Sequence, residues 1–176
     1  MDYQNITDLD LSNKVLTKLP DLSLYTNLQK LNCSNNQITT LDNLPQTITE
    51  LNCSYNKITT LENLPLTLTY LNCSINQITS LDNLPLTLTY LNCYGNNKIA
   101  TLDNLPLTLT ELYCGYNNIS SLNNLPLTLT YLDCSYNKIT SLYNLPQTLA
   151  KLNCYNNPLK YDFNPTLENI KKYKKM

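Results

Sequence analysis

Apolar residues recur along the chain with a period of 20 residues. Seven cysteines follow one another at intervals of 20, 20, 20, 21, 20 and 20 residues, at positions Cys33, Cys53, Cys73, Cys93, Cys114, Cys134 and Cys154. A leucine stands two positions before each cysteine, and an isoleucine or leucine follows five or six positions after it. A fixed period of this size indicates one structural unit stacked many times.

Within each unit, the hydrophobic pattern predicts one short strand. Apolar and polar residues alternate around Leu71 and Cys73, which places these two side chains on the inward face. The return path from Thr79 to Pro85 is too short and too close to proline for a regular helix. We therefore expect parallel strands stacked into one sheet, extended or single-turn 3₁₀ segments on the outer side, and a curved arc.

Both ends of the chain are predicted to cap the stack. The segment Ile6–Leu11 fits the same frame with Leu9 aligned to Leu31, so that eight strands are expected and the first unit is a divergent cap. Near the other end, Asn164 is expected to be the N-cap of a short helix with Pro165 as its first residue. This helix would cover the last coil.

An asparagine follows each strand and is predicted to be structural. The amide side chain should bond backbone groups inside the turn, because a buried amide without partners costs about 1–3 kcal/mol. The one extra residue of the 21-residue interval falls at Asn96 or Asn97, and the column is placed on Asn97. The predicted column is Asn36, Asn56, Asn76, Asn97, Asn117, Asn137 and Asn157.

The repeating unit, read from Leu68 to Ile78, resembles the leucine-rich repeat LxxLxLxxNxL with cysteine at the third apolar position. The resemblance covers residues 6 to 160 and is closest to the short 20-residue class of bacterial effectors and giant-virus proteins. It implies an α/β-type solenoid: a right-handed coil with a parallel β-sheet on the concave face, an extended or 3₁₀ convex side and a short C-terminal helix. We expect a single domain over residues 1–176, with a capping repeat at 1–29, seven units at 30–160 and a cap helix within 161–176.

Composition removes most catalytic chemistry. The 176 residues include no histidine, which excludes every Ser–His, Cys–His and His–metal arrangement. The net charge of −1 argues against a nucleic-acid partner. Cysteines at inward positions are expected to be free and inert, although an enzyme that uses one of them remains an alternative. We therefore expect no catalytic residue, no metal and no cofactor.

The outward positions of the strands are the candidate binding surface, because the core does not dictate them. Tyrosine, asparagine and serine dominate there, which is typical of antibody paratopes and favours recognition of a protein partner. The alternative is that the tyrosines only stabilise the sheet. The candidate partner-binding residues are Tyr55, Tyr70, Tyr90, Tyr94, Tyr113, Tyr116, Tyr131, Tyr136, Tyr155, Glu50, Glu111 and Asp133.

Two further functions are possible for a repeat of this kind. The solenoid could be an assembly module, or its regular threonine rows, for example Thr67 and Thr69, could bind ice or another ordered material. The acidic row Asp42, Glu62, Asp82 and Asp103 and the lysines Lys171, Lys172, Lys174 and Lys175 are interpreted as solvated surface.

The expected location is the cytoplasm, and the cytoplasm of a host if the protein is effector-like or viral. The start of the sequence has no basic and apolar signal pattern, and no apolar run approaches the ~20 residues of a membrane span. We expect a monomer that binds a protein of unknown identity, with no nucleic-acid partner and no membrane span.

Overall fold

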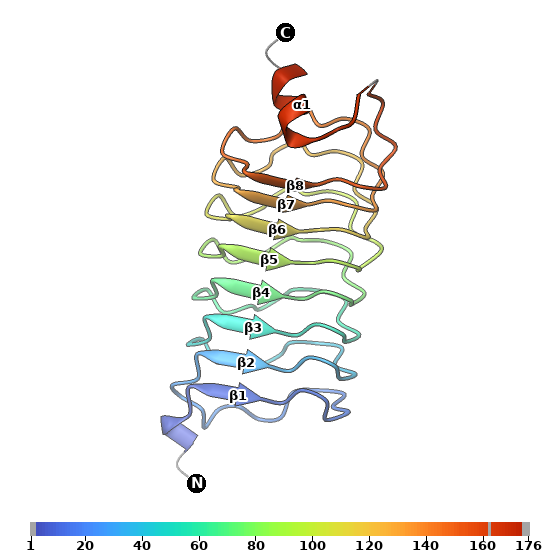
Figure 1. The fold of residues 1–176 in the computed structure, drawn as a ribbon. Helices are drawn as coiled ribbons and strands as arrows, with labels where there is room; N and C mark the ends of the chain where they lie inside the picture. Colours follow the sequence, from blue (N-terminus) through green and yellow to red (C-terminus); the bar gives the residue numbers. More distant parts are fainter. Residues whose placement is uncertain (1–2, 162, 174–176) are drawn as a thin grey trace.

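The computed structural model, which describes residues 3–161 and 163–173, stacks short parallel strands along one axis (Figure 1). The strands form one sheet in sequence order. They are β1 (Asp8–Asp10), β2 (Lys30–Asn32), β3 (Glu50–Asn52), β4 (Tyr70–Asn72), β5 (Tyr90–Asn92), β6 (Glu111–Tyr113), β7 (Tyr131–Asp133) and β8 (Lys151–Asn153). The prediction of eight stacked strands is confirmed.

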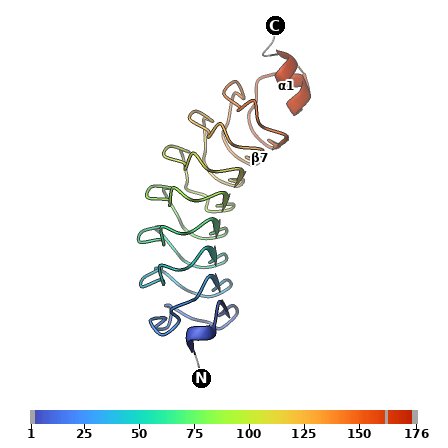
Figure 2. The same ribbon diagram turned by 90° about the vertical axis from the view of Figure 1, so that its left-hand side faces the viewer.

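The register is the one that the repeat predicts. Each central leucine pairs with the central leucine of the next strand, beginning with Leu9 opposite Leu31 and continuing with Leu31 opposite Leu51. Figure 2 shows that the stack bends into an arc with the strands on its inner side. The outward side chains of the strands therefore line the concave face, as expected.

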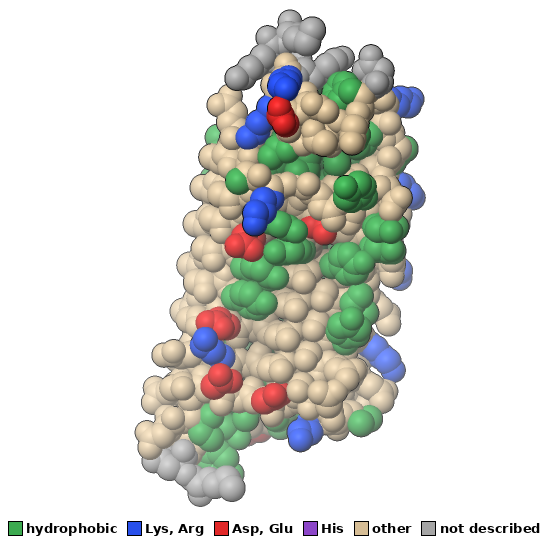
Figure 3. All heavy atoms as spheres, viewed as in Figure 1, with side chains coloured by type: hydrophobic (Ala, Val, Ile, Leu, Met, Phe, Trp, Pro, Cys, Tyr) green, Lys and Arg blue, Asp and Glu red, His purple; other side chains and the backbone are tan. Residues whose placement is uncertain are grey.

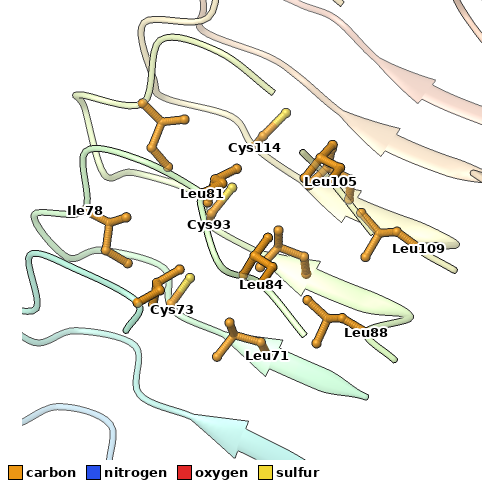
Figure 4. Packing of buried hydrophobic residues seen from close by; sticks show 14 of the residues in the cluster. Leu71, Cys73, Ile78, Leu81, Leu84, Leu88, Cys93, Leu105, Leu109 and Cys114 are labelled. Carbon is orange, nitrogen blue, oxygen red and sulfur yellow. The ribbon is translucent and has the colours of Figure 1, made fainter. Parts of the chain in front are cut away.

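The core runs the whole length of the stack. In a typical coil, Leu71, Cys73 and Ile78 are completely buried, and Leu81 and Leu84 close the opposite wall (Figure 4). Equivalent residues stack from coil to coil, so that each coil buries the apolar face of its neighbour. One coil alone could not do this, which explains why the sequence repeats.

The convex side consists of extended chain and single turns. In each central coil a turn is closed by a leucine N–H that donates to a proline carbonyl three residues earlier, such as Leu68 to Pro65 at 3.1 Å. A 3₁₀ helix occurs, among the described residues, at Tyr3–Asn5. The left-handed backbone needed at the bend comes from Asn43, Asn63, Asn83, Asn104 and Asn124, with φ between 58° and 63°.

The predicted asparagine ladder is present, with one correction. Nδ2 of Asn76 donates to the carbonyls of Cys53 and Cys73, and its Oδ1 accepts the N–H of Ile58. In the 21-residue unit the ladder residue is Asn96 rather than Asn97, because Asn96 makes the equivalent bonds. The extra residue is Asn97, which has φ 63° and is exposed.

The helix α1 (Leu167–Tyr173) closes the last coil, as predicted. Its cap is Thr166 and not Asn164: the Thr166 hydroxyl accepts the N–H of Asn169 at 3.2 Å. Lys171 donates to the carbonyl of Leu149, while Lys174 and Lys175 lie outside the described residues. No helix within 3–161 or 163–173 is long and apolar enough to cross a bilayer.

Candidate binding surface

The surface begins with the geometry of a three-residue strand. In β3 to β7 the central leucine is buried and the residues on both sides of it are half-buried, because side chains alternate across a strand. Each coil therefore presents two outward strand positions and two turn positions after the cysteine. These four positions carry all twelve of the predicted site residues.

Four tyrosines form a continuous row over β4 to β7, which we call the strand row. It consists of Tyr70, Tyr90, Tyr113 and Tyr131. The ring centroids of Tyr70 and Tyr90 are 4.2 Å apart and those of Tyr113 and Tyr131 are 4.7 Å apart, both stacked. Tyr113 belongs to the other outward column, yet its ring lies 5.4 Å from Tyr90 and completes the row beside Glu111.

Three further tyrosines form a second row, the turn row, after the strands. Tyr94 lies 5.1 Å from Tyr116, and Tyr116 is stacked on Tyr136 at 3.9 Å. Figure 3 shows the apolar and aromatic side chains of this face as two columns along the sheet. Tyr55 and Tyr155, in the turns after β3 and β8, are the most exposed of the predicted tyrosines, at 59% and 76%.

The second turn position after each cysteine has left-handed backbone. Tyr55, and Tyr116 and Tyr136 of the turn row, have φ of 52° to 53°, a region that disfavours large side chains by roughly 1–2 kcal/mol. Ile75 has the same conformation, whereas Asn35, Gly95 and Asn156 at this position tolerate it better. Large rings therefore stand where local backbone preference favours asparagine or glycine.

Both glycines of the chain lie at this surface. A Cβ at Gly115 would come within 3.0 Å of Cδ2 of Tyr94, so glycine leaves room for that ring. A Cβ at Gly95 would lie 2.6 Å from Cδ1 of Ile75. Sequence reasoning placed both glycines in the outward columns but gave them no role, because the crowding comes from neighbouring coils.

Four ring hydroxyls have a raised pKa, which favours their neutral form. Burial, followed by the neighbouring Tyr70, raises the pKa of Tyr90. A hydrogen bond with Tyr136, together with burial, raises the pKa of Tyr116 to about 12. Burial also raises the pKa of Tyr94 and Tyr113. At neutral pH these four residues therefore present uncharged hydroxyl groups that can donate or accept hydrogen bonds.

The predicted acidic residues fall into two environments. Glu50 on β3 lies next to Tyr70, at the end of the strand row, and forms a 2.8 Å ion pair with Lys30 on β2. Glu111 on β6 and Asp133 on β7 lie among the rings, and neither makes an ion pair within the described residues. The structure thus brings all three acidic residues to the rows, with the charge of Glu50 balanced by Lys30.

The cysteine column lies inside the stack and not at this surface. All seven cysteines are free and buried. Burial raises the pKa of Cys33 and Cys93 to about 12, so their thiols are protonated at neutral pH. Among the described residues, no three Cys, Asp or Glu side chains gather in a way that could hold a metal ion.

The threonine rows are already used by the backbone. The hydroxyl of Thr67 donates to the carbonyls of Gln46 and Ile48, and that of Thr69 donates to the carbonyl of Thr49. The row at Thr87, Thr108, Thr128 and Thr148 repeats the first arrangement. These hydroxyls bind neighbouring coils, so the rows offer no specific support for ice or material binding.

A second exposed surface escaped sequence reasoning. Leu66, Leu86, Leu107 and Leu127 form a row, one per coil, and each is 75–78% exposed. The signal was the leucine that follows the proline in four consecutive units, where the flanking units have Gln46 and Gln147. The sequence alone does not distinguish this column from the leucines on both sides of it, which are buried.

Comparison with known proteins agrees with this architecture. The family model described as Leucine Rich repeats (2 copies) matches residues 26–66, and the one described as Leucine Rich Repeat matches residues 128–152. Among curated proteins, no sequence matches this chain.

Solved structures supply three similar proteins. YopM, a leucine-rich effector protein from Yersinia pestis, is 34% identical with a TM-score of 0.82, over 93% of this chain and 46% of YopM. A Shigella effector domain is 29% identical with a TM-score of 0.76, over 98% of this chain and 76% of that domain. The functional domain of InlJ from Listeria monocytogenes, which includes a cysteine ladder, is 33% identical with a TM-score of 0.60, over 90% and 46%. This chain thus spans less than half of YopM and of the InlJ domain.

Proposed function

Because the chain is a leucine-rich-repeat protein, we propose that it is a non-catalytic recognition module that binds a protein partner on its concave face. One observation carries the proposal: seven tyrosines contact one another through stacked or tilted rings in two rows, at outward positions that the core leaves free. The similarity to effector domains supports a site of action in the cytoplasm of a host cell.

Stacked tyrosines suit recognition for a physical reason. A tyrosine gives a large contact area with few rotatable bonds, and stacking between neighbours holds its ring in place before binding. Ordering such a surface therefore costs little additional entropy when a partner arrives. The neutral hydroxyls supply hydrogen bonds without the cost of desolvating a charge.

The left-handed backbone of the turns supports the same proposal. If the rings only stabilised the sheet, asparagine or glycine would be the better residue at Tyr55, Tyr116 and Tyr136. Strained conformations cluster at functional sites. We therefore interpret these three tyrosines as part of the binding surface.

The test is binding by a variant that removes the strand row. We expect Tyr70→Ala/Tyr90→Ala/Tyr131→Ala to lose at least 10-fold in affinity for a partner captured from host extract by the wild-type protein. The matched control is Tyr143→Ala, because Tyr143 is an exposed tyrosine, at 53%, outside the strand and turn rows. Circular dichroism should show that both variants remain folded.

Retention of the same partner by the triple variant at unchanged affinity would contradict the proposal. The rings would then be sheet-stabilising only, and their loss would be visible in the melting temperature alone. Equal weakening by Tyr143→Ala would contradict a site on the concave face.

The absence of catalysis has its own test. We expect the native thiols to react with a disulfide reagent at neutral pH at least 100-fold more slowly than in denaturant, because each is buried and protonated. In denaturant all seven should react. A single thiol that reacts rapidly in the native protein would favour the alternative that the protein is an enzyme with a catalytic cysteine.

The exposed leucine row favours a second candidate function, assembly with another copy of the chain. Each of four successive coils contributes one leucine to the row: Leu66, Leu86, Leu107 and Leu127. The leucines of a second copy, related by a twofold axis, can therefore pack into the spaces between these side chains. An exposed apolar row of this kind is typical of an interaction surface.

Substitution by glutamine tests assembly with little risk to the fold, since Gln46 and Gln147 occupy the same place in flanking coils. If assembly occurs, light scattering should show a mass that rises with concentration for the wild type. Leu86→Gln/Leu107→Gln should remain monomeric. A wild-type mass that stays monomeric up to high concentration would exclude this candidate.

A further inference from the structure

We propose that the partner segment bound by the tyrosine rows is basic, an arginine- or lysine-rich stretch of polypeptide whose cations meet Glu111 and Asp133. This inference rests on the proposed function, because it names the chemistry of the partner for the same surface. Its starting point is that two carboxylates lie among the stacked rings without an ion-pair partner within the described residues.

Asp133 provides the clearest argument, because no cation balances its charge within the described residues. Its Oδ1 accepts the N–H and the hydroxyl of Ser135 at 3.0 and 2.6 Å. In the coil of β3, Asn52 accepts the same two bonds from Ser54 at 3.2 and 2.8 Å with a neutral amide. Oδ2 of Asp133 accepts one further bond, from Nδ2 of Asn153 at 3.0 Å. The aspartate thus keeps the bonds that asparagine makes in other coils and adds a negative charge that only neutral groups contact.

The pairing of β6 with its neighbours does not require a glutamate at position 111. It occupies the column in which the neighbouring strands have Tyr90 and Tyr131, and the ring of Tyr113 fills the gap in the row instead. A glutamate is a poor strand residue compared with tyrosine. Glu111 and Asp133 lie on the adjacent strands β6 and β7, so that one bound segment can reach both.

The charge balance of the sheet points to a cationic partner. The strands carry Asp8, Asp10, Glu50, Glu111 and Asp133 against only Lys30 and Lys151, although the whole chain has a net charge of −1. Lys30 is paired with Glu50 at 2.8 Å, and Lys151 lies next to Tyr131 at the other end of the strand row. Most of the twelve Lys lie outside the strands, so the strands are more acidic than the rest of the protein. Figure 3 shows both acidic and basic side chains next to the aromatic columns.

The rings favour the same ligand. A guanidinium or ammonium group is attracted to a tyrosine face within about 6 Å, and arginine stacks on such rings while it bonds a carboxylate. The hydroxyls of the rows are neutral at physiological pH and can accept hydrogen bonds from these cations. An acidic segment would instead meet Glu111 and Asp133 with like charge.

The test is to select peptides from a random 12-residue phage-displayed library on the wild-type protein. We expect the recovered peptides to contain arginine and lysine at least threefold more often than the starting library. A synthetic copy of a recovered peptide should bind Glu111→Gln/Asp133→Asn at least 10-fold more weakly than the wild type. Binding to the wild type should also weaken as salt is raised.

The matched control is Glu62→Gln/Asp103→Asn, which removes two exposed carboxylates of the acidic row, outside the strands and outside both tyrosine rows. It should leave the affinity within twofold. An equal loss in this control would overturn a local site, because it would show a response to net charge alone.

The two proposals fail in different ways. Peptides that lose binding to Tyr70→Ala/Tyr90→Ala/Tyr131→Ala but show no basic enrichment would overturn the inference about charge and leave recognition by the rows intact. Peptides that bind the tyrosine variant as well as the wild type would overturn recognition by the rows. Recovery of no peptide above background would count against a basic segment as the ligand.

Discussion

The charged half of the sheet, β1–β3, and the aromatic half, β4–β8, share one core and differ on their outer surface. Leu51 and Leu112 are both completely buried, and Cys53 and Cys114 lie beside them in the same arrangement. Outward from this core, the charged half has acids and an ion-paired lysine, whereas the aromatic half has the strand row and the turn row. The fold therefore does not determine which residues occupy the concave face.

Departures from local backbone preference occur in both halves. The charged half contains left-handed Val15 and Tyr55, and the aromatic half contains left-handed Ile75, Tyr116 and Tyr136. The aromatic half also contains both glycines, and one of them leaves room for the ring of Tyr94 in the turn row. In the same half, Oδ1 of Asn117 is buried and has no hydrogen-bond partner within the described residues. Such departures are expected at functional sites.

The largest expected effect tests whether the two cores are equivalent. Leu51→Ala and Leu112→Ala should each lower the free energy of unfolding by about 2–5 kcal/mol, since each leaves a cavity beside a buried cysteine. Urea denaturation measures both losses. A loss in one half that is several-fold smaller would show that the two cores are packed differently.

The next effect distinguishes a regular coil from the irregular one. Asn76→Ala should lower the free energy of unfolding by about 3 kcal/mol. It leaves the N–H of Ile58 and the carbonyls of Cys53 and Cys73 without their hydrogen bonds to Asn76. Asn117→Ala should cost less, about 1–2 kcal/mol, because its Oδ1 has no partner to lose. Both residues are 7% exposed, so burial is matched. Equal losses in urea denaturation would mean that Oδ1 of Asn117 is satisfied in solution.

A smaller effect concerns the left-handed tyrosines. Tyr55→Asn should raise the free energy of unfolding by about 1 kcal/mol, because asparagine tolerates the conformation that Tyr55 holds at φ 53°. Tyr136→Asn should be close to neutral, since the lost stacking on Tyr116 offsets the relief of strain. Thermal melts of the two variants give the difference. Destabilisation by Tyr55→Asn would remove the argument from strain.

The sequence predicted the fold well because the fold follows from periodicity. The cysteine interval sets seven strands in register, together with the inward columns and the structural asparagines, and Leu9 aligns the eighth strand with Leu31. The prediction that Asn97 belongs to the asparagine column was wrong, because only the hydrogen bonds to neighbouring coils show that Asn96 occupies this place. The prediction that Asn164 is the N-cap was wrong for a similar reason: Asn164 and Thr166 are both good caps by residue type.

The candidate site was predictable in its positions but not in its contacts. Alternation along the strand identified all the outward tyrosines. It could not show that the ring of Tyr113 contacts Tyr90 in the strand row, or that the ring of Tyr94 lies against Gly115. Both contacts depend on side chains that neighbouring coils place nearby. The exposed leucine row was hidden because hydrophobicity does not distinguish Leu86 from the buried Leu84 and Leu88.

The smallest effect is a pH dependence confined to the tyrosine rows. An unfolded tyrosine ionises near pH 10, whereas the hydrogen bond with Tyr136 raises the pKa of Tyr116 to about 12 in the folded protein. Above pH 10 the unfolded state therefore loses protons first, so the stability contributed by this group is present below pH 10 and is lost as the pH rises towards 12. Absorbance at 295 nm should show late ionisation in the folded protein, and Tyr116→Phe should remove part of it. Complete ionisation of the folded wild type near pH 10 would show that the turn row is open to solvent and its hydroxyls are not bonded to one another.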